Sequence, residues 1–502
     1  MRAVDAWAIE EAGIPSLELM ERAGEGLARS VAAVAGAGPI RVVAGRGNNG
    51  GDGLVAARLL RAEGREVDVL AAGNLDELGG DARVNLERLD GEPPRALGPG
   101  ALGGSAAIVD AVLGTGAGGA PREEAARAIF AINAAGARVV ACDVPSGVDA
   151  STGEVETEAV RATVTATFHA PKVGLAVDPG REHAGEVRSI PIGVPRGAPE
   201  ASGVGSISSR VLALVPRRSR GATKFSSGSV VVAGGARGLT GAPCMAALAA
   251  MRAGAGYVQL AVPVSSEPAF ELRLLEAMTR GLPDSDGAHT PEGVEGVVEL
   301  AGRAGAVVLG PGLGRSTGAV AFARGVASAV EAPLLIDADG LNAHAGALES
   351  LASRSAPTVL TPHAGELGRL LDRDPEAIGA SRLRSAREAA ERSGAVVVLK
   401  GDDTIVAAPG GPVAVSPGAS PALATAGTGD VLSGVIGTLL AKGLEPFVAA
   451  AAGVLAHGRA GIVAGGRIGA DHTIASDVIE ALGPAFTIAE DLPSAPSPRG
   501  RG

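Results

Sequence analysis

Short apolar runs alternate along the chain with segments whose apolar residues have helical spacing. In the first half, runs rich in Val, Ile, Leu and Ala cover residues 40–44, 66–71, 106–113 and 138–142. Runs of this length and composition are typical of buried strands, and segments such as 54–63 and 123–134 have the composition or spacing of helices. Alternating strands and helices predict an α/β fold built on a parallel sheet.

The second half repeats this pattern, and its apolar runs lead into polar or glycine-rich loops. These runs cover residues 230–233, 256–262, 306–309, 334–336, 359–360 and 396–399. The carboxyl ends of parallel strands lie together at one edge of a sheet, where ligands bind. Each half of the chain is therefore expected to have its own ligand-binding edge.

The sequence Gly427-Thr428-Gly429-Asp430 stands at the start of an apolar helical pattern that continues to Leu440. The start of a helix presents unpaired N–H groups that can bind phosphate, and glycine lets an anion approach the backbone closely. Phosphate repels a carboxylate, so Asp430 would be useful there as the base for a hydroxyl that attacks the phosphate. Alternatively, Asp430 only stabilises the first helical turn.

Three loops of the first half combine glycine with oxygen-bearing side chains. These side chains are Asn48, Asn49 and Asp52 in loop 45–53, Asp110 before loop 114–119, and Asp143 in loop 143–149. Amide and carboxylate oxygens can bind a cation or a ribose, although Asn and Asp also occur in loops merely because they favour turns. The convergence of three such loops at one sheet edge favours a ligand site.

Composition narrows the classes of partner. The net charge is −11 and no long basic run occurs, so nucleic acid and anionic membranes are not expected as partners. Aromatic residues make up only 2%, so ring stacking is not expected to dominate nucleotide binding. Cys142 and Cys244 stand far apart in apolar surroundings and are predicted to be reduced and buried.

Three further segments bear on organisation. Segment 447–464 is apolar but contains His457 and Arg459, which favours a buried helix over a membrane span, and a cytoplasmic protein is expected. Segment 191–220 is rich in Pro, Gly, Ser and Arg, and predicts a domain boundary near residue 205. The tail, 489–502, is expected to be disordered.

The first half resembles the NAD(P)H-hydrate epimerase family, which has a Rossmann-like fold, in the motifs at 19–24, 48–52 and 143–147. The resemblance implies that a domain over residues 1–205 interconverts the two C6 epimers of hydrated NADH or NADPH. Asp143 is then a catalytic residue, and Lys172 is either its partner or an ordinary surface lysine. The implied substrate-binding residues are Asn48, Asn49, Gly50, Gly51, Asp52, Gly114, Thr115, Gly116, Ala117, Gly118, Gly119, Ala120 and Asp143. The implied K⁺ ligands are Asn49, Asp110 and Ser146, an all-oxygen set that suits a hard cation.

The second half resembles the ADP-dependent NAD(P)H-hydrate dehydratases, which have a ribokinase-like fold, in its order of motifs at 310–314, 337–342, 361–366, 400–404 and 427–430. The resemblance implies a dehydratase domain over residues 206–488, with Asp430 as its catalytic carboxylate and Mg²⁺ on the nucleotide. The implied hydrate-binding residues are Ala242, Gly312, His363 and Asp430, and the implied ADP-binding residues are Lys400, Gly401, Asp402, Asp403, Thr404 and Gly429. The family often has His before the lysine at position 224, whereas this chain has Thr223 before Lys224.

Together the two resemblances imply a bifunctional repair enzyme for hydrated nicotinamide cofactors, acting on NADHX or NADPHX with ADP, and a homo-oligomer is expected. The alternative is a ribokinase-like small-molecule kinase fused to a non-catalytic Rossmann-like binding module. A kinase would accumulate a phosphorylated substrate, whereas a dehydratase would release AMP and free phosphate.

Overall fold

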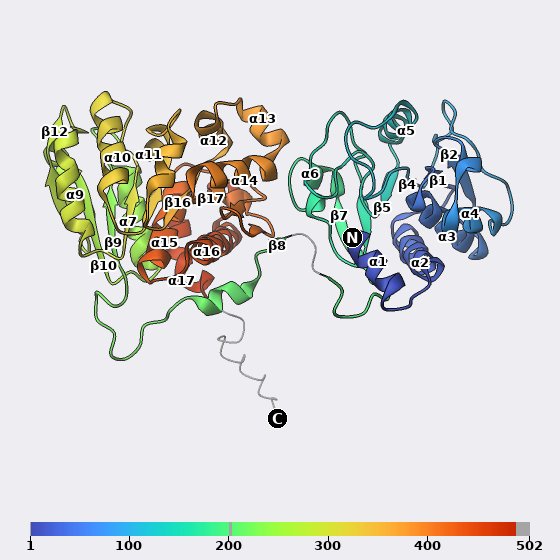
Figure 1. The fold of residues 1–502 in the computed structure, drawn as a ribbon, viewed down its shortest axis with the longest axis horizontal. Helices are drawn as coiled ribbons and strands as arrows, with labels where there is room; N and C mark the ends of the chain where they lie inside the picture. Colours follow the sequence, from blue (N-terminus) through green and yellow to red (C-terminus); the bar gives the residue numbers. More distant parts are fainter. Residues whose placement is uncertain (1, 200–202, 488–502) are drawn as a thin grey trace. The chain divides into compact units, whose positions relative to one another are not determined.

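The computed structural model describes residues 2–199 and 203–487. The chain forms two compact units, Met1–Gly203 and Val204–Gly502. Figure 1 shows the first unit in blue to green and the second in green to red. Each unit has a mainly parallel sheet covered by helices, which confirms the predicted α/β class.

The first unit is built on a seven-stranded, all-parallel sheet in the order β3-β2-β1-β4-β5-β6-β7. The strands are β1 (Ile40–Ala44), β2 (Val67–Ala71), β3 (Arg95–Ala96), β4 (Ala107–Ala111), β5 (Arg138–Cys142), β6 (Val164–Phe168) and β7 (Glu186–Ile190). The chain reverses its direction across the sheet between β1 and β4. Such a switch point opens a crevice at the carboxyl ends of the strands, where ligands bind.

Two hydrophobic clusters cover the two faces of this sheet. On one face Val42 packs with α2 and α3, and on the other Val43 packs with α5. Successive residues of a strand point to opposite faces, so β1 contributes to both clusters. The helices are α1 (Arg2–Glu10), α2 (Ser16–Val34), α3 (Asn48–Ala62), α4 (Gly80–Glu87), α5 (Glu123–Ala134) and α6 (Gly180–Ala184). The first unit therefore has the predicted three-layer, Rossmann-like arrangement.

The second unit contains a ten-stranded sheet in the order β11-β10-β9-β14-β15-β16-β17-β18-β19-β8. Its strands are β8 (Val204–Ser206), β9 (Ser229–Ala233), β10 (Tyr257–Pro263), β11 (Met278–Leu282), β14 (Ala306–Leu309), β15 (Leu334–Ile336), β16 (Thr358–Leu360), β17 (Val396–Leu399), β18 (Ile405–Ala407) and β19 (Val413–Val415). All neighbours from β11 to β17 are parallel, whereas β18 is antiparallel to both β17 and β19. A small hairpin, β12 (Asp284–Ser285) and β13 (Ala288–His289), stands apart from this sheet.

Four helices, α7, α15, α16 and α17, pack with β9 in a hydrophobic cluster of the second unit, which includes Val230 and Val232. The helices of this unit are α7 (Gly241–Arg252), α8 (Glu267–Arg273), α9 (Val294–Ala301), α10 (Thr317–Ala329), α11 (Ala338–Asn342), α12 (Ala364–Leu371), α13 (Pro375–Ala380), α14 (Arg382–Ser393), α15 (Thr428–Ala441), α16 (Pro446–Ile468) and α17 (Ala475–Ala485). Alanine and glycine on these helices allow close approach: an added Cβ at Gly434 would lie 2.1 Å from the carbonyl oxygen of Ala246.

The α16 helix is the one helix in the described residues that is long and apolar enough to cross a membrane, and 72% of its most apolar window is buried inside the unit. This agrees with the predicted buried helix. Cys142 and Cys244 are also buried and unpaired, as predicted. Residues 204 and 205 pair with β19, so they belong to the second sheet, although the sequence placed them in the first domain. The predicted tail, 489–502, lies outside the described residues.

Candidate active sites

A cavity of about 740 Å³ opens at the carboxyl ends of β1, β4 and β5 in the first unit. It is lined by residues from loops far apart in the sequence, among them Asn48, Asn49, Asp52, all of 114–120, and Asp143. Gly50 and Gly51 do not line it. An added Cβ at Gly50 would lie 2.1 Å from the carbonyl oxygen of Gly45, so this glycine is needed for packing at the start of α3. The structure thus brings together most of the residues predicted for the first site.

Asp143 forms an ion pair with Lys172 in the wall of this cavity. The backbone of Asp143 is left-handed, with φ 67°, which is uncommon for a residue other than glycine. Its Oδ1 also accepts hydrogen bonds from the Phe168 N–H, at 2.9 Å, and from Thr167 Oγ1, at 3.2 Å. Lys172 Nζ donates a second bond to the Phe168 carbonyl oxygen, at 2.8 Å. These contacts fix the positions of both charged groups. A strained backbone such as that of Asp143 is frequent at functional sites.

Two further carboxyl groups, those of Asp52 and Asp5, line the same cavity as this ion pair. Burial, together with the negative charge of Asp143, raises the pKa of Asp52 well above its usual value. Burial also raises the pKa of Asp5, a residue on α1 that lines the same cavity. A carboxyl with a raised pKa holds its proton more readily and can act as a proton donor to a bound ligand. The cavity therefore has the groups needed to move a proton on a bound ligand.

Behind the cavity wall, Asp110 and Ser146 form a buried cluster of oxygen atoms. Ser146 Oγ donates to Asp110 Oδ1 at 2.6 Å, and the Ser146 N–H donates to Asp110 Oδ2 at 2.8 Å. Asn49 Nδ2 donates to the carbonyl oxygen of Leu113 at 3.0 Å, and Ser146 Oγ lies 3.3 Å from the same carbonyl. Burial raises the pKa of Asp110 to about 6, although its bonds to Ser146 oppose the shift. Of the three residues predicted to hold K⁺, Asp110 and Ser146 contact each other directly, and Asn49 and Ser146 both contact the carbonyl oxygen of Leu113.

In the second unit, the sequence Gly427–Asp430 forms the start of α15. Gly427 has φ 92°, and an added Cβ would lie 2.5 Å from Met245 Sδ, so this turn requires glycine. Burial, followed by the charge of Asp337, raises the pKa of Asp430 to about 7; Glu366 contributes in the same direction and Lys400 opposes. A carboxyl with this pKa at neutral pH can accept a proton and release it again.

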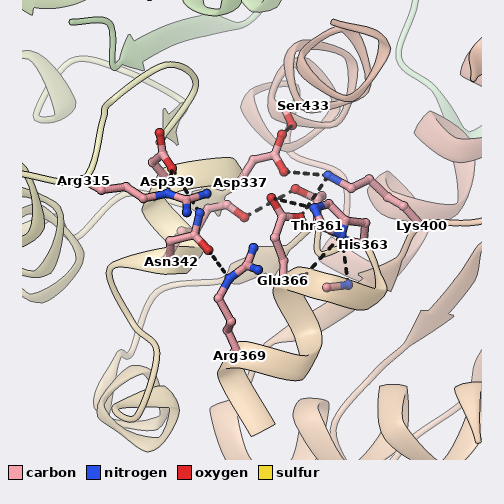
Figure 2. A network of polar contacts seen from close by, with 12 residues as sticks. Arg315, Asp337, Asp339, Asn342, Thr361, His363, Glu366, Arg369, Lys400 and Ser433 are labelled. Atoms are coloured by element: carbon pink, nitrogen blue, oxygen red, sulfur yellow. Dashed lines mark hydrogen bonds and ion pairs between the residues drawn. The ribbon is translucent and has the colours of Figure 1, made fainter. Parts of the chain in front are cut away.

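Lys400 links the carboxylates of this site, as Figure 2 shows. Its Nζ lies 2.9 Å from Asp337 Oδ1 and 3.5 Å from Glu366 Oε2. Ser433 Oγ donates to the other oxygen of Asp337 at 2.6 Å. Burial alone would lower the pKa of Lys400, but Asp337 and Glu366 overcome this effect and raise it. An added Cβ at Gly429 would lie 3.6 Å from Lys400 Nζ, so the ammonium group is next to the start of α15.

Of the residues predicted to bind the hydrate, Gly312 lies on the loop after β14, Ala242 in the first turn of α7, His363 at the start of α12 and Asp430 in the first turn of α15. An added Cβ at Gly312, which has φ 63°, would lie 3.4 Å from Ala242 Cβ. His363 is the N-cap of α12: its Nδ1 accepts the Gly365 N–H at 3.0 Å, while the His363 N–H donates to Glu366 Oε2 at 2.9 Å. Burial lowers the pKa of His363, so its ring is neutral at pH 7 and carries its proton on Nε2.

Most side chains of loop 400–404 form hydrogen bonds or ion pairs with other protein groups, which fixes the conformation of the loop. Asp403 is fully buried and pairs with Arg382, with Arg382 Nε 2.9 Å from Asp403 Oδ2. Thr404 Oγ1 donates to the Gly401 carbonyl oxygen at 2.7 Å, and Asp402 Oδ1 accepts the Ala419 N–H at 3.0 Å. Of the residues predicted to bind ADP, Lys400 and Gly429 are therefore the two that the structure places beside Asp430.

Comparison with known proteins connects both units to named families. A family model described as NAD(P)H-hydrate dehydratase matches residues 230–483, and a model described as YjeF-related protein N-terminus matches residues 16–174. A bifunctional NAD(P)H-hydrate repair enzyme of Salinibacter ruber is 42% identical over 483 residues, covering 90% of this chain and 88% of that protein. The enzyme of the same name from Moorella thermoacetica is 38% identical and covers 96% of this chain and 94% of that protein.

The chain belongs to the family of bifunctional NAD(P)H-hydrate repair enzymes.

This family membership confirms the resemblance inferred from the sequence motifs. Among solved structures, an ADP/ATP-dependent NAD(P)H-hydrate dehydratase from Bacillus subtilis, co-crystallised with ATP and Mg²⁺, is 27% identical, with a TM-score of 0.49. It covers 57% of this chain, and the match covers 99% of that protein.

In this member of the repair enzyme family, three carboxyl groups of these two candidate sites had no role assigned from the sequence: Asp5, Asp337 and Glu366. Asp337 and Glu366 follow strands β15 and β16 closely, so their position after an apolar run was an available signal. Asp5 lies on a helix and gave no such signal. Lys224, which follows Thr223 where this chain departs from the family pattern, has its Nζ 5.2 and 5.0 Å from the ring centroids of Phe225 and Tyr257.

Proposed function

We propose that this chain repairs hydrated nicotinamide cofactors in two steps, one in each unit. The first unit interconverts the R and S epimers of NADHX and NADPHX. The second unit dehydrates the S epimer with ADP, giving NADH or NADPH, AMP and phosphate. The observation that carries the proposal is Asp430, a carboxyl with a pKa of about 7 at a phosphate-binding helix start, next to Lys400.

In the dehydratase step, Asp430 accepts the proton of the C6 hydroxyl as the hydroxyl oxygen attacks the β-phosphorus of ADP. The bond between that phosphorus and AMP breaks, and AMP leaves. The N–H groups at the start of α15 and Lys400 stabilise the charge on the transferred phosphate. The C6–O bond then breaks with the ring nitrogen's electron pair, phosphate leaves, and loss of a proton from C5 completes the double bond.

We propose that Mg²⁺, when bound together with ADP, would be held mainly by the nucleotide and would supply positive charge against its phosphates. Asp337 and Glu366 are already engaged by Lys400, and the described residues contain no group of three or more His, Cys, Asp or Glu side chains arranged to hold a metal ion. Bound Mg²⁺ offsets phosphate charge in phosphoryl transfer. A homo-oligomeric, cytoplasmic enzyme is part of the same proposal.

In the epimerase step, Asp143 and Lys172 form the ion pair at the reacting ring, and Asp52, whose pKa is raised by burial, supplies a second carboxyl in the same cavity. Asn48, Asn49 and residues 114–120 line the cavity and are proposed to hold the nucleotide. K⁺ suits the cluster behind the wall, because Asp110 supplies one negative charge while Ser146, Leu113 and Asn49 supply neutral oxygens.

The experiment that tests this function supplies the full-length protein with a mixture of both hydrate epimers, ADP and Mg²⁺. Complete conversion to the reduced cofactor, with equal amounts of AMP and free phosphate, is expected. Conversion that stops when the S epimer is consumed would contradict the role of the first unit. A phosphorylated product that accumulates without release of phosphate would favour a kinase.

We predict that K⁺ stabilises the first unit through Asp110. The Asp110→Asn variant keeps the size of the side chain but removes the charge, so it should lose both the K⁺ dependence of epimerisation and the rise in thermal midpoint that K⁺ causes. The measurement compares KCl with tetramethylammonium chloride at equal ionic strength. An equal response of the variant and the natural protein to K⁺ would place the ion elsewhere.

We also predict the pH dependence of dehydration. Asp430 must be ionised to accept a proton, and its pKa is raised to about 7. The value of kcat/KM should therefore fall on the acidic side of about pH 7, by about tenfold per pH unit below pH 6, whereas it should level off above pH 8. This acidic limb should be absent from the residual activity of Asp430→Asn, and a limb that persists unchanged would assign it to another group.

A further inference from the structure

The short helix α11 contacts both the loop that contains Gly312 and the helix α12, which begins after His363. On the loop side, Asp339 Oδ1 accepts Arg315 Nε at 2.8 Å, and Asp339 Oδ2 accepts the Gly314 N–H at 3.0 Å. The first residue of α11, Ala338, has φ 50°, a strained conformation for alanine. The strain and the contacts of Asp339 fix one arginine beside the loop that is proposed to hold the hydrate.

On the other side, α11 holds a second arginine. Asn342 Oδ1 accepts Arg369 Nε at 2.7 Å, while Asn342 Nδ2 donates to Asp339 Oδ1 at 3.0 Å. Figure 2 shows this chain of contacts from Arg315 through Asp339 and Asn342 to Arg369. Both guanidinium groups are bound through Nε, which leaves their terminal nitrogens for another acceptor.

Arg369 lies beside His363 and has no carboxylate within ion-pair distance among the residues described. An added Cβ at Gly365 would lie 3.8 Å from Arg369 Nη1 and 2.9 Å from His363 Cε1, so both side chains border the same small volume. Arg315, by contrast, is paired with Asp339. Of the two, Arg369 therefore supplies the uncompensated positive charge at the hydrate site.

The interior of the same site has the opposite sign. Asp337, Glu366 and Asp430 are three carboxyl groups, and among the described residues Lys400 is the lysine or arginine that forms ion pairs with Asp337 and Glu366 and lowers the pKa of Asp430. A nicotinamide dinucleotide carries a negatively charged diphosphate, and ADP is also an anion. A substrate with this charge needs positive groups at the mouth of the site to offset repulsion from its interior.

We propose that Arg369, assisted by Arg315, binds a phosphate group of the hydrate's nucleotide portion. A guanidinium group presents parallel N–H donors that match two phosphate oxygens, and an arginine already fixed through Nε loses little freedom on binding. The phosphate is either the bridging diphosphate, present in both hydrates, or the 2′-phosphate, present only in NADPHX. The proposal rests on the dehydratase function of the second unit and names part of its substrate site.

The test measures kcat and KM of the full-length protein for S-NADHX, S-NADPHX and ADP in Arg369→Gln, Arg369→Lys and Arg315→Gln. Arg369→Gln is expected to raise the KM for the hydrate by about 10- to 100-fold, the usual effect of losing charge-assisted hydrogen bonds, with little change in kcat or in the KM for ADP. A rise for both hydrates identifies the diphosphate, and a rise for NADPHX alone identifies the 2′-phosphate. Arg369→Lys should recover part of the loss, and Arg315→Gln should have a smaller effect.

Arg303→Gln is the matched control, because Arg303 is exposed on the turn before the amino end of β14, at the opposite edge of the sheet. An unchanged KM for both hydrates in Arg369→Gln, or a rise in the KM for ADP alone, would overturn the proposal. The thermal midpoints of all variants identify any loss of folding. If Arg369→Gln is unstable, the KM of Arg369→Lys tests the proposal instead, because lysine keeps the positive charge. Absence of dehydration by the natural protein would instead refute the proposed function itself.

Discussion

Dehydration by the Asp430→Asn variant is expected to be about 10²- to 10⁴-fold slower than by the natural protein, the usual effect of removing a positioned general base. Asparagine keeps the shape of the side chain but cannot accept the hydroxyl proton. The free energy of unfolding should change by less than about 1 kcal/mol. The start of α15 stabilises the negative charge of Asp430, but burial destabilises the same charge, so its removal has opposing effects. ADP should bind as tightly or more tightly, since a negative charge beside its phosphates is gone.

The measurement combines the thermal midpoint, ADP affinity and both activities on one preparation. Asp374→Asn is the matched control, because Asp374 also stands at the start of a helix, α13, but is exposed and makes no capping bond there. Epimerisation should be unchanged in both variants. Near-normal dehydration by Asp430→Asn, or an equal loss of both activities, would remove Asp430 from the proposed role.

Epimerisation by the Asp143→Asn variant is expected to fall by about 10²- to 10⁴-fold, while dehydration of pure S epimer stays normal. This substitution also leaves Lys172 without its ion-pair partner, and the Lys172 side chain is only 4% exposed. An uncompensated buried charge costs about 3–5 kcal/mol, so the first unit should lose stability as well as activity. The loss of activity could then have two causes.

The double variant Asp143→Asn/Lys172→Met separates them. Removing the ammonium group should restore much of the thermal stability, since no unpaired charge is left, but it should not restore epimerisation. Recovery of both properties together would assign Asp143 a structural role only. Dehydration of S epimer in the same preparation monitors the integrity of the second unit.

Much of the fold followed from local pattern. The runs at 40–44 and 138–142 are strands, and the glycine-rich segment at 427–429 begins a helix, because apolar composition and glycine act on the backbone nearby. Strands β6 and β7 were missed. β6 contains two threonines that are fully buried, and β7 is a half-exposed edge strand with Glu and Arg, so neither has the apolar run of a central strand.

Some site residues could likewise be recognised from the local sequence, whereas others could not. Asp430 was noticed because its neighbours, Gly427 to Gly429, predict a helix start that binds phosphate. A carboxylate is unfavourable beside phosphate unless it has a chemical role. Asp337 and Glu366 were present in recognised motifs, yet nothing near them in the sequence tells that both contact Lys400. The assignment of individual binding residues stays a prediction for the experiments above.

By itself, the sequence determined the α/β class, the order of the two units and the loops that carry the chemistry, because these depend on residue type and spacing over short stretches. Only the tertiary structure decided which charged groups share a site, as with Asp143 and Lys172 or Asp337 and Lys400. It thereby also raised the pKa of Asp52 and of Asp430 above the usual value of an aspartate. The physical reason is that burial and the distance between charges set a pKa, and both depend on residues brought together from distant parts of the chain.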